Sequence, residues 1–183
     1  KPSGYRFRNL FQSGVLAGRW KPGSVFALKG VFEELDYGHD FYAPQSMLAE
    51  DGRRIIIAWM NMWDSPVPTR REAWAGCLTL PREVFERDGR LCQRPVREVE
   101  TLRRAHQQLS PVRLHDSQLL AENAQAAELL VTWHKVDSYA EHYGIRLGDG
   151  LRIYVDNQAG RLVLWRYYPE EGLDGYRSVA LPD

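Results

Sequence analysis

The sequence of 183 residues predicts an all-β protein with one short helix near its middle. Three observations support this class. Short apolar segments recur with turn-forming residues about every ten positions. One of them, 55–59, has no polar face, which is typical of an inner strand of packed sheets or propeller blades. Only the stretch 95–111 shows a convincing helical period.

The first half is expected to contain a series of short antiparallel strands. Turn residues separate them: Gly30 and Gly38 end the first two, 50–52 (Glu-Asp-Gly) reverses the chain between the next two, and Pro81 ends the last. The reversal at 50–52 predicts a β-hairpin. The expected strands are 24–28, 31–35, 41–48, 53–59 and 75–80.

An amphipathic helix is expected between Pro95 and Pro111. Its apolar side recurs at three- to four-residue intervals, and charged residues occupy the other side. We interpret it as a linker that packs between two β regions, which gives three parts: 1–90, 91–111 and 112–183. The apolar positions are Val96, Val99, Leu102, Ala105 or His106, and Leu109.

After the helix a period of two returns, as expected for strands with one buried face. The turn 156–160 joins two of them, and the set is expected to form about half of a β-sandwich. Because about five strands leave unpaired edges, we expect truncation at both ends and association through those edges. The expected strands are 128–133, 143–147, 151–156, 162–168 and 176–181.

Composition excludes several function classes. Lys plus Arg (24) balance Asp plus Glu (24), so the chain has no net charge to attract nucleic acid or an anionic membrane. The longest apolar run, 55–60, is far below the roughly 20 residues of a membrane span. Cys77 and Cys92 have neither metal-ligand nor redox spacing, which favours a reducing compartment. A neutral small molecule is the expected partner, with no cofactor and no metal.

Three segments carry the most information: 36–47 (DYGHDFYAPQSM), 52–60 (GRRIIIAWM) and 74–83 (WAGCLTLPRE). In this order and spacing they resemble the late propeller motifs of glycoside hydrolase family 32. Further stretches resemble cytoplasmic sucrose hydrolases of enteric-type bacteria, so the resemblance covers nearly the whole chain. These stretches are 5–18, 94–102 and 156–177.

The resemblance implies both a fold and an activity. The parent would be a five-bladed β-propeller followed by a β-sandwich, and this chain would hold the last blade or blades, a short helical linker and a partial sandwich. The parent would be a cytoplasmic retaining glycosidase that hydrolyses the β-D-fructofuranoside bond of sucrose to glucose and fructose. Sucrose, sucrose 6-phosphate and other fructosides all remain open as preferred substrates.

The resemblance also implies that no catalytic residue lies in this chain. Family members use an aspartate nucleophile, a glutamate acid/base and a stabilising aspartate, in Asn-Asp-Pro, Arg-Asp-Pro and Glu-Cys segments upstream of the motifs found here. None of these segments occurs, since Arg87-Asp88 is followed by Gly89. Glu83, Glu86 and Glu98 fall in surface or linker contexts. The chain alone is therefore expected to be inactive.

Substrate contacts are expected near the first motif. The family places an aspartate at the position of Asp36 close to the sugar pocket, with Lys or His at the position of His39. Such a carboxylate can hold two sugar hydroxyls, and an imidazole can orient it. The alternative for Asp36 is a cap on the turn made by Tyr37 and Gly38.

Aromatic residues give a second set of candidates. Trp59 and Trp63 follow the apolar strand and could stack on a sugar ring, with core packing as the alternative for Trp59. Asp40, Tyr42 and Gln45 are interpreted as supports behind the contact residues. A different class of function also stays open, namely a non-catalytic carbohydrate-binding or structural β module, and the coding sequence upstream of Lys1 would discriminate between the two.

Overall fold

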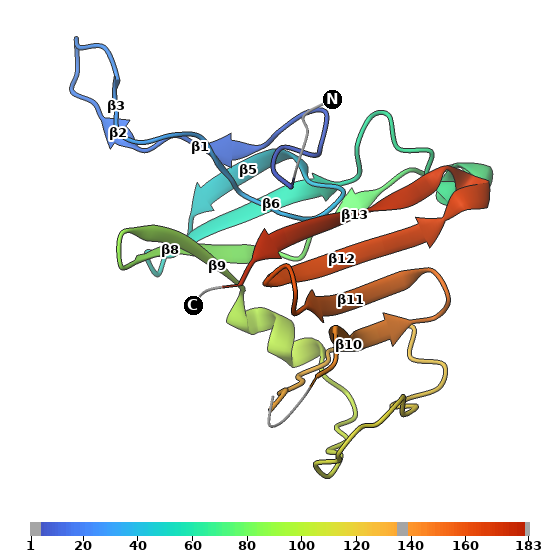
Figure 1. The fold of residues 1–183 in the computed structure, drawn as a ribbon. Helices are drawn as coiled ribbons and strands as arrows, with labels where there is room; N and C mark the ends of the chain where they lie inside the picture. The colour runs from blue at the N-terminus through green and yellow to red at the C-terminus, as the bar shows by residue number, and fades with distance from the viewer. Residues whose placement is uncertain (1–4, 135–138, 182–183) are drawn as a thin grey trace.

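The computed structural model describes residues 5–134 and 139–181, and short antiparallel strands make up its regular structure (Figure 1). The only helices in these ranges are three 3-10 turns: η1 (Pro68–Glu72), η2 (Arg97–Leu102) and η3 (Pro169–Glu171). The all-β class is confirmed. None of these helices is long and apolar enough to cross a membrane.

A five-stranded antiparallel sheet forms the centre of the first half. Its order is β5-β6-β8-β9, and β7 also pairs with β6. The predicted hairpin is confirmed, because Leu48 pairs with Arg54 across the reversal at 50–52. The strands are β5 (Tyr42–Leu48), β6 (Arg54–Met60), β7 (Cys77–Leu78), β8 (Arg82–Arg87) and β9 (Arg90–Pro95).

Strand β6 is covered on both faces, as its uninterrupted apolar run predicts. Ile55 and Ile56, which point to opposite faces, are 8% and 6% exposed, and Ala58 is buried as well. Phe41, Ile56 and Ala58 form the core cluster, with Leu35 and Val84 packed against it.

The hairpin β8–β9 was not predicted. Asp88 and Gly89 have φ values of 52° and 75°, which two-residue hairpin turns of type I′ require. Asp-Gly is the usual sequence of such a turn, so the signal was present. The flanking strands are rich in charge and lack the clean alternation by which strands are read.

The strands predicted at 24–28, 31–35 and 75–80 are much shorter in the structure. Each keeps two residues: β3 (Ala27–Leu28), β4 (Glu33–Glu34) and β7. The first two pair with β2 (Gly18–Arg19) and β1 (Gly14–Val15) in small two-stranded ladders. The β2–β3 ladder projects from the body (Figure 1), so it has no core to bury its apolar side chains.

The helix predicted over 95–111 is wrong in extent and type. Only η2 forms, through i to i+3 bonds, and Arg103 at its end is extended. Residues 103–134 contain no regular element. Val96 is buried, but Leu102 is 69% exposed and Leu109 44%, so the apolar side of the predicted helix is covered only at its start, and amphipathic helices depend on such packing.

A four-stranded meander forms the second sheet, in the order β10-β11-β12-β13. Four of the predicted strands are confirmed, whereas the one at 128–133 is wrong: it is extended without a partner, and Leu130 is 98% exposed. The strands are β10 (His142–Leu147), β11 (Leu151–Asp156), β12 (Arg161–Tyr168) and β13 (Leu173–Ala180).

The second sheet meets the first half through β12 and β13, which lie nearest to it in Figure 1. Arg166 of β12 donates to Asp40, which precedes β5. Arg177 of β13 donates twice to Asn9, and Arg71 pairs with Glu171 at 2.8 Å. These polar contacts join segments more than 90 residues apart, and they position the candidate site described next.

Candidate functional site

An aromatic cluster lies at the end of β6. Trp59 and Trp63 are in edge contact with ring centroids 5.3 Å apart, and Tyr42 contacts both at 6.4 and 6.3 Å. Phe11 adds a fourth ring, 5.8 Å from Tyr42. Trp63 is 60% exposed, so the cluster presents an aromatic face to solvent.

Two backbone features position these rings: a bulge in β5 and the close approach of Gly76. Strand β5 carries a bulge, since Tyr42 pairs with Trp59 but Gln45 already pairs with Ile57. Ala43 takes a φ of 48° within it. On the other side of β6, the backbone of Gly76 runs so close to Trp59 that an added Cβ would lie 2.4 Å from the indole Nε1.

Asp36 is held by two structural partners. Its Oδ1 accepts from the Gly38 amide at 2.7 Å, so it caps the turn, as the alternative reading expected. Its Oδ2 accepts from Arg82 at 2.7 Å, and the Arg82 guanidinium also lies over the Phe41 ring. A role in substrate contact stays a prediction, and these bonds fix the carboxylate in place.

His39 lies beneath the second sheet. It is 8% exposed, and an added Cβ on Gly175 of β13 would lie 3.9 Å from its Cε1. Burial, together with the nearby guanidinium groups of Arg166 and Arg177, lowers the pKa of His39 to about 4, and Asp40 opposes them. The imidazole is therefore neutral at physiological pH, and its contact with a substrate remains a prediction.

Asp40 and Gln45 differ in how firmly they are held. The Asp40 carboxylate accepts from Ser65 at 3.0 Å and from Arg166. Ser65 follows Trp63 closely, so Asp40 ties the segment that carries Trp63 to the loop before β5. Gln45 is exposed and donates to the carbonyl of Ala43 at 3.5 Å.

Sequence reasoning missed three residues around the candidates: Phe11, Arg82 and Arg166. Arg82 stands inside the quoted segment 74–83, but its pairing with Asp36 crosses 46 positions. Arg166 lies 126 positions from Asp40. No local spacing signals contacts of that range, and only the topology brings them together.

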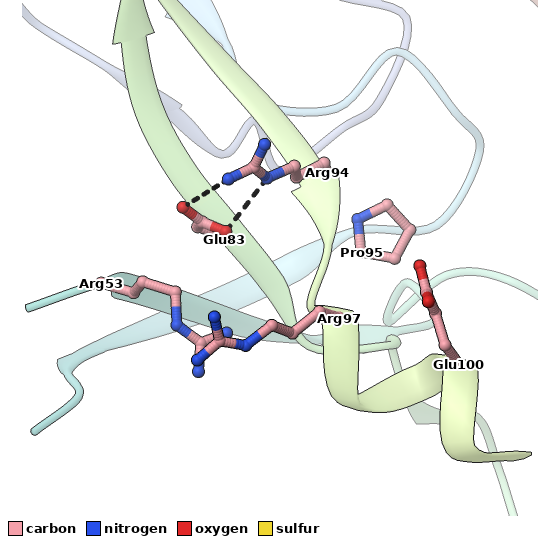
Figure 2. Close-up of a pocket in the computed structure, with 6 residues that line it drawn as sticks. All are labelled: Arg53, Glu83, Arg94, Pro95, Arg97 and Glu100. Atoms are coloured by element: carbon pink, nitrogen blue, oxygen red, sulfur yellow. Dashed lines mark hydrogen bonds and ion pairs between the residues drawn. The ribbon is translucent and has the colours of Figure 1, made fainter. Parts of the chain in front are cut away.

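A pocket of about 330 Å³ opens at the opposite end of β6 (Figure 2). Arg53 and Trp59 are separated by about 20 Å along an extended strand, so the pocket is distinct from the aromatic cluster. It is lined by Arg53, Glu83, Arg94, Pro95, Arg97 and Glu100.

Ion pairs occupy the charged groups of this pocket. Arg94 bonds Glu83 in bidentate fashion, as drawn in Figure 2, and Arg53 does the same with Glu98. Arg53 and Arg97 both reach Asp51. The network fastens η2 to the β5–β6 hairpin, the Arg94–Glu83 pair joins β9 to β8, and these guanidinium groups are matched by carboxylates.

Comparison with models of protein families identifies the family to which the chain belongs. The model of the "Glycosyl hydrolases family 32 N-terminal domain" matches residues 1–95. The chain belongs to glycoside hydrolase family 32. The resemblance read from the three segments is thereby confirmed.

Curated relatives agree with this family 32 assignment. The chain is 91% identical over 182 residues to a raffinose invertase of Escherichia coli and 60% identical over 179 residues to a sucrose-6-phosphate hydrolase of Escherichia coli. These alignments cover 100% and 98% of the chain but only 38% of each relative. The chain thus spans well under half the length of these relatives.

Solved structures show the same fold. A GH32 β-fructofuranosidase of Bombyx mori superposes with a TM-score of 0.67 at 24% identity, covering 100% of this chain and 38% of that one. A sucrose-6-phosphate hydrolase of Lactobacillus gasseri gives 0.56 at 22% identity, covering 86% and 33%.

The three glutamates considered from the sequence of this family 32 chain have structural partners. Glu83 pairs with Arg94, Glu86 accepts from the Gly89 amide, and Glu98 pairs with Arg53. Glu86 and Glu98 are exposed, as expected from sequence, whereas Glu83 lies on β8 with a side chain that is only 14% exposed. No group of three or more His, Cys, Asp or Glu side chains within 5–134 and 139–181 is arranged to hold a metal ion.

Proposed function

We propose that this chain is the closing part of a longer retaining glycosidase that hydrolyses the β-D-fructofuranoside bond of sucrose or a related fructoside. The observation that carries the proposal is the 91% identity with the raffinose invertase over 182 residues. A retaining mechanism needs two carboxyl groups about 5 to 5.5 Å apart. The Asn-Asp-Pro, Arg-Asp-Pro and Glu-Cys segments that carry the carboxylates in the family do not occur in this sequence, so the nucleophile and the acid/base would come from the rest of the parent.

The aromatic cluster is our proposed sugar-facing surface. Trp59 and Trp63 would stack on the apolar face of a sugar ring, and Tyr42 would support them from β5. Asp36 and His39 would act nearby, Asp36 with one carboxylate oxygen beside the Gly38 turn. Asp40 and Gln45 would hold the surrounding segments in place.

We also propose the finer architecture that the family suggests. The five-stranded sheet would belong to the last blade of a five-bladed propeller, and the four-stranded sheet would be part of a β-sandwich, with 91–111 linking 1–90 to 112–183. The antiparallel order of both sheets supports this division. Cys77 and Cys92 are free thiols, which supports a cytoplasmic location.

A chimera tests the activity. In it, these residues replace the matching 38% of the Escherichia coli raffinose invertase. We expect the chimera to hydrolyse sucrose and the 183-residue chain alone to show no turnover above background, because the nucleophile and the acid/base act as a unit. An inactive chimera that folds normally would contradict the proposal, and so would turnover by the isolated chain at the chimera's rate.

The same chimera tests the aromatic surface. Trp63→Ala should raise KM for sucrose by about tenfold, which corresponds to about 1.4 kcal/mol of lost binding. Trp20→Ala is the control, since this tryptophan is similarly exposed and lies beside the projecting ladder. Equal KM values for the two variants would remove Trp63 from the substrate site. Assays with sucrose and sucrose 6-phosphate side by side distinguish the two substrates.

A carbohydrate-binding module is the second candidate, because the exposed aromatic face is present in this chain by itself. Titration of the isolated chain with sucrose, followed by tryptophan fluorescence, tests it. Saturable binding that Trp63→Ala abolishes, together with an inactive chimera, would favour this second function over hydrolysis.

A further inference from the structure

Four side chains meet where the loop before β5 lies against the second sheet: His39 and Asp40 from the loop, Arg166 from β12 and Arg177 from β13. We propose that this cluster, the latch, is an acid-sensitive contact that holds the β10–β13 sheet against the five-stranded sheet and releases it when His39 gains a proton.

The geometry leaves no acceptor for a second proton on the imidazole. One ring nitrogen is hydrogen-bonded to the backbone of Leu164. The other, Nε2, is buried with no hydrogen-bond partner in the described part of the chain. Gly175 of β13 lies close to the ring, because a Cβ added there would be 3.9 Å from His39 Cε1. A protonated imidazole would thus carry an unpaired N–H in a buried site, which costs free energy that the separated sheets would not incur.

The charges around the ring also disfavour protonation of His39 in the docked form. Two guanidinium groups, Arg166 and Arg177, face His39, and Asp40 is the one carboxylate beside it. Asp40 is already engaged with Arg166 and Ser65, while Arg177 donates to the neutral side chain of Asn9. Further out, Arg8 and Glu34 act on Arg177 with opposite signs. Protonation would therefore add a third positive charge next to one carboxylate.

The sign of the pH dependence follows from linkage. In the docked form the pKa of His39 is about 4, chiefly because of burial, and when the sheets separate it returns to the ordinary 6.5. The separated form therefore binds the proton more tightly. Docking is unaffected above pH 6.5 and weakens as the pH falls towards 4, by up to about 300-fold in the docking equilibrium.

Energy transfer between two dyes on the full 183-residue chain measures the separation. One dye is attached to Cys77, which is exposed on β7, and the other to an Asp149→Cys substitution in the exposed β10–β11 turn, with Cys92→Ser to avoid a third label. We expect transfer to fall between pH 6.5 and 4. Asp40→Asn should lower transfer already at pH 7, because Arg166 loses its charged partner.

Two histidine variants give the decisive comparison. His39→Gln keeps an amide that can bond the Leu164 carbonyl and cannot titrate, so its transfer should persist to lower pH. His115→Gln, at an exposed position, should behave like the parent. A parent that shows no fall, or a His39→Gln variant that separates at the parent's pH, would overturn the latch.

An independent measurement uses the unlabelled chain. NMR of the His39 ring should show its protonation over the same pH interval as the loss of transfer. Protonation while the sheets stay docked would equally rule out the proposal, whatever the variants do.

Discussion

Gly76 fixes the position of Trp59 more directly than any contact of the indole ring with its aromatic neighbours. An added Cβ would lie 2.4 Å from Trp59 Nε1 and 2.6 Å from Asn61 Cβ, and the φ of 70° is itself unfavourable for other residues. Asn61 is almost fully buried, so neither neighbour can move away freely.

Gly76→Ala should therefore lower the free energy of unfolding by about 2–3 kcal/mol, combining backbone strain with a steric clash. Urea unfolding followed by circular dichroism measures this. Gly52→Ala is the matched control, since Gly52 has a φ of 86° with nothing within 4 Å of an added Cβ. Equal losses for the two variants would show that strain alone matters and that Trp59 is not clamped.

Asp36 offers a second prediction at a single residue. Asp36→Asn keeps an oxygen for the Gly38 amide but removes the charged partner of Arg82, and both side chains are mostly buried. We expect a loss of about 1–3 kcal/mol in stability at neutral pH. Asp51→Asn, in an exposed turn where the carboxylate pairs with Arg53 and Arg97, should cost less. The same denaturation curves decide the point, and a larger effect at Asp51 would contradict it.

At the scale of single residues, the sequence predicted local hydrogen bonds better than contacts with residues far along the chain. The turn cap at Asp36 could be predicted because it is local: the carboxylate reaches an amide two positions away. The burial of His39 could not be predicted, because the residues that cover it belong to β12 and β13. A polar residue in a turn-rich loop is usually exposed, and here a second sheet overrides that tendency.

Strand β6 is the element on which the first sheet depends. Ile56→Ala removes buried methyl groups from the small core cluster, and such changes cost about 2–4 kcal/mol. Met47→Ala on the neighbouring β5, where the side chain is exposed, should cost less than about 0.5 kcal/mol. Thermal unfolding of both variants tests the difference, and comparable midpoints would mean that the cluster contributes little.

Elements were predictable where a strand has both a clear apolar pattern, alternating or uninterrupted, and a neighbour. The hairpin β5–β6 and the meander β10–β13 satisfy both conditions. The segments 95–111 and 128–133 have suitable patterns, but most of their apolar side chains are exposed, Leu102 and Leu130 among them, so neither the full helix nor the strand forms. An apolar sequence pattern predicts which face of an element should be buried, but it does not predict whether another part of the protein covers that face.

The whole molecule exposes far more surface than a compact protein of its mass. Its accessible surface is 14906 Å², whereas a folded monomer of 21.1 kDa exposes about 9000 Å². Large apolar side chains are open on many elements, including Leu10, Val25 and Leu119. Surfaces of this kind normally contact other protein.

The isolated chain should therefore bind a hydrophobic dye such as ANS and self-associate, whereas the chimera with the invertase should do neither. Dye fluorescence and sedimentation velocity on both proteins provide the measurements. A monodisperse monomer that binds no dye would show that the exposed apolar side chains are tolerated in solution.

The long separation between Asp40 and Arg166 has a consequence for biosynthesis. Hairpins such as β5–β6 and β8–β9 join neighbours in the chain and can close while translation continues, because short loops close fastest. The bond to Arg166 must wait until the ribosome has released 126 further residues. During that interval β12 and β13 do not yet cover the imidazole at position 39, so the proposed sensitivity to acid arises only after the second sheet has been made.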